Sequence, residues 1–540
     1  PAVYYAQAKD VLAGKVVPDH AYFHSSPLYP FFLAAVARVG GSGLQTVRIV
    51  QACLGVCSVY LVFLLARLTV GKRAGLVSAF LAAVYVPFIF FEAEILEITI
   101  VIAAVLGSLL MLVARRERPG PLTAAVAGAL LGVAGMGKPN ILLFAPVGAL
   151  WLLMTRGAEA RGHRGRTGPR ARTLSAALFF IAAGCVVLPA TIHNYRAEGD
   201  FIPVSSNGGI NFFIGNHANS PGVFQVPPDM RFDLRAASQA AAERVAGRTL
   251  SAGEVSGFWT RETLRQIAAD PAGWIRLAGR KFVLFWNHYE IPNHYHLYFV
   301  QTFAPVLRIP VGTFGVVAPL GVLGLALALL RRKKVGVLVV FGLTFMISVV
   351  AFFITGRYRL AVVPVLLVGA GYSVDWLWLR ARARRWRSLA IACVCLAVLA
   401  VGVNVHMIEF GFAQMYNSVG SILGTRGDME GAAAEFEKAV GANPDDLSSR
   451  YNLGLALLEL ARYDEAARQF EAAVARYRRY HEAWIGLARA RSAQGRPEEA
   501  LEALTAAESL DPPAVLAAEI ERMKQSLTGP DDAKEEERNQ

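Results

Sequence analysis

Basic residues fall in every second gap between the apolar segments of this chain. Five such gaps carry them, at residues 67–73, 115–118, 156–172, 331–334 and 380–387. Short loops rich in Lys and Arg stay on the cytoplasmic side of a membrane. The alternation therefore predicts that these five gaps face the cytoplasm and that the intervening gaps lie on the outer face.

The apolar segments themselves are long enough to predict membrane helices. The chain has 540 residues, of which 54% are hydrophobic, and its mean hydropathy is +0.40, more apolar than soluble cores require. Several segments approach or reach the roughly 20 residues that span a bilayer. We predict an all-α multi-pass membrane protein with ten spans, at about 44–66, 74–91, 98–114, 121–137, 139–155, 173–192, 303–330, 335–355, 359–379 and 388–408.

The formal net charge of +13 does not indicate nucleic-acid binding. The positive charge sits in short loops that flank apolar spans, and membrane topology already accounts for it. The five cysteines all lie inside apolar segments, where they act as small hydrophobic residues. We therefore expect no disulfide, no metal site and no cofactor.

The spans divide the chain into six parts. They are a first outer loop with interfacial helices (1–43), membrane helices (44–192), a mixed outer loop domain (193–301), further membrane helices (302–410), repeats with a capping helix (413–528) and a disordered tail (529–540). The chain opens at Pro1 in a polar, aromatic segment, and the parity of the spans predicts one more membrane helix upstream.

The loop domain carries local signals of secondary structure. The run "DFIPVSSNGGINFFIGN" predicts extended structure with turns. Ser251 and Glu254 have the spacing of a capping box that opens a helix. A second helix should begin at Asp270-Pro271, and its aromatic and basic residues predict a position at the membrane surface.

A 34-residue repeat occupies the C-terminal part. Gly420, Gly454 and Ala488 are in register, and so are Phe436 and Phe470. This pattern resembles tetratricopeptide repeats, in which small residues let paired helices pack closely. It predicts an α-solenoid, which parity places on the outer side, with a protein partner bound to the repeats.

Five ionisable residues lie in outward gaps at the ends of predicted spans. Glu94 and Glu97 are three residues apart and would share one helix face, Lys138 precedes Pro139, and Arg357 and Arg359 lie in "GRYRL". Such groups are costly at a membrane edge unless they are solvated, paired or functional. They are either hydrated or lipid-contacting residues, or a site in which the carboxylates act on an acceptor and the cations bind a phosphate.

Other polar residues are weaker candidates. Tyr29 is a candidate substrate contact, and His24 is either a loop residue or an acceptor contact. Asn211 and Asn216 either satisfy the backbone of turns or bind sugar hydroxyls. His288, His294 and His296 lack an acidic or Cys partner at ligand spacing, so we do not expect them to bind metal.

Seven motifs in order resemble bacterial family 39 glycosyltransferases over roughly residues 1–405. They are "YYAQAKDVLAG", "HSSPLYPFFLA", "VGKRAGLVSAFLAAVYVPFIFFEAEILE", "GMGKPN", "NYRAEGDFIPVSSNGGINFFIGN", "KFVLFWNHYEIPN" and "GRYRLAVVPVLLVGAG". Members of this family resemble protein mannosyltransferases and lipid A aminoarabinose transferases and share the membrane-embedded C-type glycosyltransferase fold.

The resemblance implies a sugar transferase in a bacterial inner membrane with a periplasmic site. It implies a polyprenyl-phosphate sugar donor, a protein, lipid or glycan acceptor, and an inverting displacement. Glu94 and Glu97 match the family's acidic second outer loop and would be catalytic, while Lys138, Arg359 and Arg357 would hold the phosphate. The acidic residue of the family's first loop would lie at or before Pro1.

Two alternatives stay open at this point. An oligosaccharide polymerase or ligase of the O-antigen type can carry similar repeats, although its large outer loop usually comes later in the chain. A membrane scaffold that displays the repeats without catalysis would show the same topology.

Overall fold

The protein forms two compact units in a computed structural model, Pro1–Glu409 and Phe410–Gln540. We call them the membrane unit and the repeat unit. The structure describes residues 2–14, 26–41, 43–114, 120–154, 168–227, 234–293, 296–408, 411–510, 512 and 514–536.

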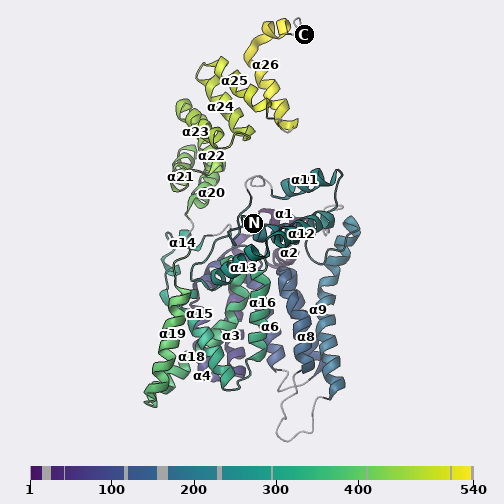
Figure 1. Ribbon diagram of the computed structural model, residues 1–540, viewed down its shortest axis with the longest axis vertical. Coiled ribbons are helices and arrows are strands. Elements are labelled where there is room, and N and C mark those ends of the chain that lie inside the picture. The colour runs from purple at the N-terminus through teal and green to yellow at the C-terminus, as the bar shows by residue number, and fades with distance from the viewer. Residues whose placement is uncertain are drawn as a thin grey trace. The chain divides into compact units, whose positions relative to one another are not determined.

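Helices dominate the described part of both units (Figure 1). Among the described residues, the β-type pairing is an isolated bridge between Val223 and Ile354. This confirms the prediction of an all-α chain.

The first half of the membrane unit runs from α1 to α9. Its elements are α1 (Ala2–Leu12), α2 (Leu28–Gly40), α3 (Leu44–Thr69), α4 (Lys72–Ala83), α5 (Val86–Ala93), α6 (Ile98–Ala114), α7 (Pro121–Gly137), η1 (Pro139–Leu143), α8 (Phe144–Met154) and α9 (Pro169–Glu198).

The loop domain and the last membrane helices complete this unit. The loop domain contains α10 (Gly208–Asn216), α11 (Leu234–Ala246), α12 (Ala252–Ala269), α13 (Pro271–Trp286) and α14 (Leu297–Val300). The chain then continues through η3 (Pro305–Leu307), η4 (Pro310–Gly312), α15 (Phe314–Leu330), α16 (Gly336–Val350), α17 (Gly356–Arg359), η5 (Leu360–Val362), α18 (Val363–Arg382) and α19 (Trp386–Val403).

Four helices of the described chain are long and apolar enough to cross a membrane: α3, α9, the α17–α18 stretch and α19. The pair α4 and α5, bent by 49°, adds a fifth if it is one span. Helices also occupy the other predicted spans but are shorter. The seventh begins only at Phe314, because Pro305 and Pro310 break the preceding segment into short 3₁₀ turns.

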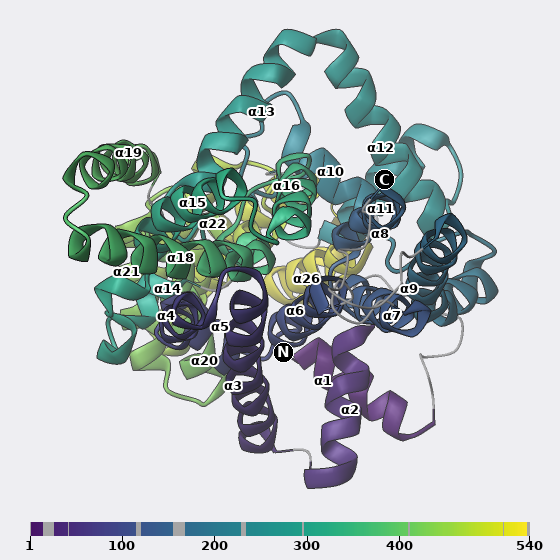
Figure 2. The same ribbon diagram turned by 90° about the horizontal axis from the view of Figure 1, so that it is seen from below.

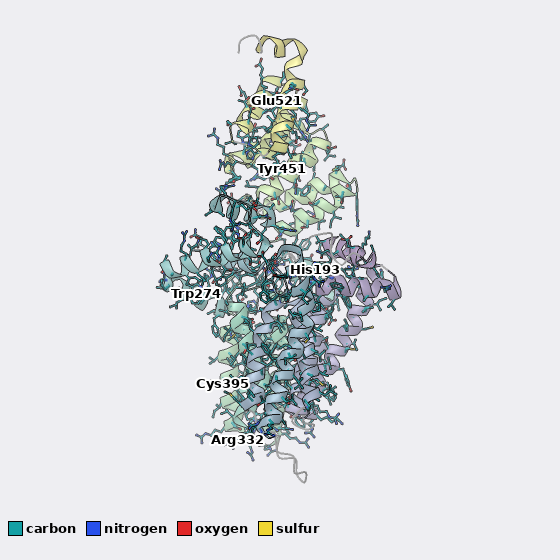
Figure 3. The ribbon with its side chains drawn as sticks, turned by 90° about the vertical axis from the view of Figure 1, so that its right-hand side faces the viewer. His193, Trp274, Arg332, Cys395, Tyr451 and Glu521 are labelled. Carbon is teal, nitrogen blue, oxygen red and sulfur yellow. The ribbon has the colours of Figure 1, made fainter. Side chains whose placement is uncertain are left out.

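The membrane helices pack through glycines that allow close backbone approach. Gly128 of α7 lies against the backbone of Phe179 in α9, and Gly324 of α15 lies against the carbonyl of Gly369 in α18. Small residues at such contacts are typical of helix pairs in membranes. Arg332, from one basic gap, lies at the opposite end of these helices from Trp274 of α13 and His193 of α9 (Figure 3).

The prediction of extended structure across residues 200–216 is wrong for residues 208–216, which form helix α10. Ile210 and Ile214 are four residues apart and pack in one cluster with Trp259 and Phe353. That spacing places both isoleucines on one face of a helix, whereas a strand would alternate faces. Tertiary burial therefore decided the local conformation.

The two helix starts predicted in the loop domain are confirmed. At α12 the Ser251 hydroxyl accepts from the Glu254 N–H, and the Glu254 carboxylate accepts from the Ser251 N–H, which completes a capping box. At α13 the Asp270 carboxylate accepts from the N–H of Gly273, and Pro271 occupies the first turn.

The repeat unit is a solenoid of paired helices, as predicted. Its elements are α20 (Ala413–Thr425), α21 (Met429–Ala442), α22 (Leu447–Glu459), α23 (Tyr463–Arg476), α24 (His481–Ala493), α25 (Pro497–Glu508) and α26 (Ala514–Glu536). The last helix continues past residue 528 through a stretch we expected to be disordered. Its Ala, Lys and Glu residues have high helix propensity.

Phe470 of α23 is the central side chain of this solenoid. It is fully buried, and its ring lies between Gly454 of α22 and Gly486 of α24, where an added Cβ would come within 2.6 Å and 2.5 Å of ring atoms. Gly454, one of the small residues in register along the sequence, and Gly486, two residues before the register position Ala488, therefore make room for the aromatic ring.

We expect Phe470→Ala to lower the free energy of unfolding of the repeat unit by about 3–5 kcal/mol, because the substitution leaves a cavity between two helix pairs. Pulse proteolysis of the full chain in urea would measure the midpoint at which this unit becomes cleavable. Ile422→Ala is the control, since that side chain is 52% exposed in the same unit. Equal midpoints for the two variants would contradict this packing.

Candidate functional site

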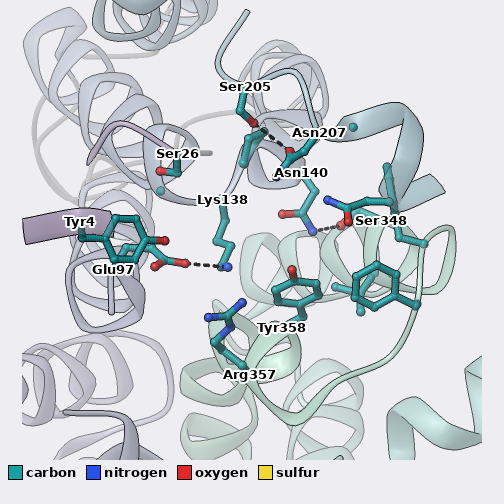
Figure 4. Close-up of a pocket in the computed structure, with 17 residues that line it drawn as sticks. Tyr4, Ser26, Glu97, Lys138, Asn140, Ser205, Asn207, Ser348, Arg357 and Tyr358 are labelled. Carbon is teal, nitrogen blue, oxygen red and sulfur yellow. Dashed lines mark hydrogen bonds and ion pairs between the residues drawn. The ribbon is translucent and has the colours of Figure 1, made fainter. Parts of the chain in front are cut away.

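A cavity of about 230 Å³ lies where several loops meet at the loop-domain end of the membrane helices (Figure 4). We call it the polar pocket. Its lining residues are Tyr4, Ser26, Glu97, Gly137, Lys138, Pro139, Asn140, Ser205, Asn207, Gly208, Asn211, Ser348, Val349, Phe352, Phe353, Arg357 and Tyr358.

One wall of the pocket is ionic. Glu97 immediately precedes α6, and Lys138 is held in an extended conformation between α7 and η1, where Pro139 starts the next turn. The Lys138 Nζ lies 2.7 Å from the Glu97 Oε1, and the Glu97 side chain is only 4% exposed. Two loops that are about forty residues apart in sequence thus meet in one buried ion pair.

Helix α17 adds a second cation and an aromatic ring to this wall. The Lys138 Nζ lies 4.4 Å from the centroid of the Tyr358 ring, and the Arg357 Cζ lies 5.3 Å from it. Both cations therefore lie over one aromatic ring, whose negative π face attracts cations electrostatically. The Thr355 hydroxyl caps the helix by accepting from the Tyr358 N–H.

The charges on this wall determine the state of the Glu97 carboxyl. Burial raises its pKa, but the Lys138 ammonium and the Arg357 guanidinium outweigh burial and bring the pKa to about 2. The carboxylate is therefore ionised at neutral pH. Its Oε1 is paired with Lys138, whereas its Oε2 is buried with no hydrogen-bond partner from the described residues.

The other wall consists of amides and hydroxyls. The Asn140 Nδ2 donates to the Ser348 hydroxyl at 3.1 Å, and the Ser205 hydroxyl donates to the Asn207 Oδ1 at 3.2 Å. Asn211, one turn further along α10, lines the same side. Figure 4 shows Asn140, Ser348 and Asn207 across the cavity from Glu97. This wall can donate to and accept from the hydroxyls of a sugar.

Arg359 does not reach the pocket, contrary to the prediction. Its guanidinium is 1% exposed, lies 2.9 Å from the Glu290 Oε1 and sits 3.8 Å from the centroid of the Phe314 ring. It also donates to the backbone carbonyls of residues 285, 287 and 289. Arg357 and Arg359 are two residues apart on a helix, so their side chains leave it on opposite sides.

Glu94 is also separated from Glu97. It follows the last residue of α5, it does not line the pocket, and its backbone carbonyl accepts from the Gln51 Nε2 at 2.7 Å. Burial raises the pKa of its carboxyl, and Arg48 opposes that rise. The segment 94–97 is a turn rather than a helix, so a spacing of three does not give these two residues a common face.

The remaining candidates divide between pocket and core. Asn211 lines the pocket. Tyr29 is fully buried, donates to the Gln51 Oε1 at 2.6 Å and packs edge-on against Tyr4, so it supports a lining residue without lining the pocket itself. Asn216 is buried at the far end of α10. His24 lies outside the described residues.

Several pocket residues were not predicted. Asn140 and Tyr358 lie within the motifs "GMGKPN" and "GRYRL", next to cations that were predicted, so their positions carried a signal. Tyr4 and Ser26 likewise lie within the motifs "YYAQAKDVLAG" and "HSSPLYPFFLA", whereas Ser348 lies outside the seven motifs and nothing in its local sequence marks it. Among the described residues no three His, Cys, Asp or Glu side chains are grouped to hold a metal, and His294 lies outside that part of the chain.

Comparisons with known proteins bear on both units. The sequence profile of dolichyl-phosphate-mannose-protein mannosyltransferases matches residues 19–183, and a tetratricopeptide-repeat profile matches residues 420–467 and 451–515. A comparison with the curated proteins finds no match.

Solved structures show distant likeness. ArnT from Cupriavidus metallidurans bound to undecaprenyl phosphate is 14% identical, with 93% of this chain and 74% of that chain covered at a TM-score of 0.40. The Archaeoglobus fulgidus oligosaccharyltransferase tethered to an acceptor peptide is 14% identical. The match covers 80% of this chain and 54% of that chain, at a TM-score of 0.41. The tetratricopeptide-repeat protein YrrB is 15% identical. The match covers 43% of this chain and 100% of that chain, at a TM-score of 0.20. At these scores the likeness carries no inference about activity.

The two profile matches confirm the resemblance drawn from the motifs. The match over residues 19–183 to the profile of dolichyl-phosphate-mannose-protein mannosyltransferases supports a membrane glycosyltransferase with a lipid-linked sugar donor, and residues 420–515 are tetratricopeptide repeats.

Proposed function

We propose that this protein transfers a sugar from a polyprenyl-phosphate donor to an acceptor hydroxyl in the polar pocket. The reaction takes place on the periplasmic side of a bacterial inner membrane. The observation that carries the proposal is the buried Glu97 carboxylate, which is paired through one oxygen with Lys138 and whose other oxygen has no hydrogen-bond donor in the described part of the chain. The family match supports a lipid-linked donor.

Lys138 and Arg357 are the groups that would hold the donor phosphate. Both are cations on the same wall, and the Arg357 Nε is buried without a hydrogen-bond partner from the described residues. A phosphate oxygen can accept from this N–H and from the Lys138 ammonium, and such charge-assisted hydrogen bonds are strong. Arg359, which we first assigned to the phosphate, keeps a structural role.

Glu97 would orient and deprotonate the acceptor. The acceptor hydroxyl donates to the free Oε2, its oxygen attacks the anomeric carbon from the face opposite the phosphate, and the bond from that carbon to the phosphate oxygen breaks. The hydroxyl proton passes to Glu97, and the electron pair of the broken bond stays on the phosphate. A bound phosphate offsets the charge of the two cations, so it raises the pKa of Glu97 and makes it a better base.

The amide and hydroxyl wall would bind the sugar, and the repeats would bind a protein. Asn140, Asn207 and Asn211 offer donors and acceptors for several hydroxyl groups at once. The tetratricopeptide repeats support a protein partner, which is either the acceptor itself or a protein that presents the acceptor.

We expect Glu97→Gln to lower transfer about 100-fold or more, because an amide keeps the shape of the side chain but cannot take a proton. The assay follows radiolabelled hexose from undecaprenyl-phosphate hexose to the envelope fraction of a deletion strain. Glu94→Gln is the matched control and should retain activity, since Glu94 lies outside the pocket. Equal membrane levels of both variants must be shown, and an active Glu97→Gln enzyme would exclude this role.

We expect Lys138→Ala and Arg357→Ala each to weaken binding of undecaprenyl phosphate about tenfold to a hundredfold, since each removes a charged hydrogen-bond donor. Calorimetry in detergent would measure the dissociation constant without any acceptor. Arg67→Ala, in the basic gap at the far end of the helices, is the control. An unchanged dissociation constant in both pocket variants would remove the phosphate from this wall.

The pH dependence of transfer should also change in Lys138→Ala. Before the donor binds, Glu97 has a pKa of about 2, so its protonation does not limit kcat/KM between pH 5 and 8. Without Lys138 the largest opposing charge is gone, burial dominates, and the acidic limb of kcat/KM should move up by about one to three pH units. Rates measured at limiting donor test this, and an acidic limb that stays in place would contradict the role of Glu97 as the base.

A further inference from the structure

Helix α13 presents an apolar face that nothing in the described chain covers. Ile275, Phe282 and Val283 are 65%, 47% and 44% exposed, and Ala272 and Gly279 are exposed on the same side of the helix. Arg276 and Arg280 border this stripe and are also exposed. We call these seven residues the α13 face.

The position of α13 indicates what covers this face. The helix lies across the loop-domain end of the membrane helices, and the α12–α13 hairpin extends beyond them when the bundle is seen end-on (Figures 1 and 2). Exposed apolar residues continue along the chain at Phe303, Val306 and Val311, directly before α15 enters the bundle. An apolar stripe bordered by arginines, on a helix at the end of a membrane bundle, is typical of a helix that lies in a lipid headgroup layer.

The opposite side of α13 is tied to one wall of the polar pocket. The Lys281 Nζ and the Trp274 Nε1 donate to the Asn216 Oδ1 at 2.7 Å and 3.0 Å. Asn216 is the last residue of α10, and its Nδ2 donates to the carbonyl of Ala351 at 2.9 Å. The first turn of the same short helix carries Asn211 in the pocket, so a shift of α13 is transmitted to the amide wall.

The C-terminal end of α13 is tied to the other wall. Arg359 donates to the carbonyl of Phe285 inside the last turn of α13 and to the carbonyls of Asn287 and Tyr289 just beyond it. The Gly356 N–H donates to the carbonyl of Ile291 at 2.8 Å. These bonds fix helix α17, whose Arg357 belongs to the ionic wall. Both walls of the pocket are therefore anchored to one helix.

We propose that the α13 face docks on the outer leaflet of the bilayer, with its apolar stripe among the acyl chains and Arg276 and Arg280 on anionic lipid phosphates. Through Lys281 and Arg359, which are positioning residues, docking sets the distance between the two pocket walls. The docking on a lipid surface stands on the geometry of α13. The choice of the outer leaflet and the effect on the pocket rest on the proposed function.

A depth measurement tests the docking without any activity. Spin labels are placed at Ile275→Cys and Phe282→Cys, and at Val245→Cys on the exposed side of α11 as control, in a background with the five native cysteines replaced by alanine. In nanodiscs that contain phosphatidylglycerol, the first two labels should be more accessible to oxygen than to a water-soluble nickel complex, and the control label should show the reverse. Water accessibility at 275 and 282 would overturn the docking.

The role of the arginines is tested in the same nanodiscs. In the parent protein, the label at position 275 should lie deeper in nanodiscs that contain phosphatidylglycerol than in nanodiscs of phosphatidylcholine. In the double variant Arg276→Gln, Arg280→Gln, the depth of this label should be the same in both lipids. A parent whose label depth does not depend on lipid charge would exclude the contact with anionic phosphates.

The coupling is tested by the affinity for undecaprenyl phosphate. Ile275→Asp with Phe282→Asp should raise its dissociation constant about fivefold or more, while Val245→Asp should leave it unchanged. If the labels report lipid but this constant does not move, the coupling is wrong and the docking stands. If Lys138→Ala does not change the constant either, the proposed phosphate site itself is wrong, so the two failures are distinguishable.

Discussion

The buried ion pair between Glu97 and Lys138 is the contact on which the architecture of the site depends. A carboxylate that is almost wholly removed from water is unfavourable by several kcal/mol unless a cation meets it. The loop before α6 and the loop after α7 must therefore stay together, and Arg357 adds a second positive charge from α17. The other carboxylate oxygen has no hydrogen-bond partner among the described residues, and it is the oxygen to which the proposed function assigns the acceptor hydroxyl.

Helix α17 shows how one short element can serve both structure and chemistry. Its two arginines are two residues apart and therefore point to opposite sides. Arg357 lines the pocket, whereas Arg359 forms an ion pair with Glu290 and donates hydrogen bonds to backbone carbonyls at the end of α13. The hydrogen bonds of Arg359 therefore join the short helix that carries Arg357 to the C-terminal end of α13.

The packing of the repeat unit is easier to predict from the sequence than the packing of the membrane unit. Its helices pack through a periodic set of small and aromatic residues, so the sequence period and the structural period coincide. The membrane unit has no such repeat, and its site combines residues from α1, the loops after α5 and α7, α10, α16 and α17. That is why the repeats were predicted almost residue by residue, while the pocket was predicted only in part.

The sequence by itself determined the helical class, the places of the membrane helices and the repeats, because these follow from local hydropathy, charge and period. It also marked Glu97, Lys138 and Arg357, since ionisable residues at the ends of apolar helices are rare and costly. Only the tertiary structure decided that Glu94 and Arg359 lie elsewhere, that residues 208–216 form a helix, and that Asn140 and Ser348 face the cavity. Those outcomes depend on which side of a turn each chain segment presents once the helices pack, and no local pattern encodes that orientation.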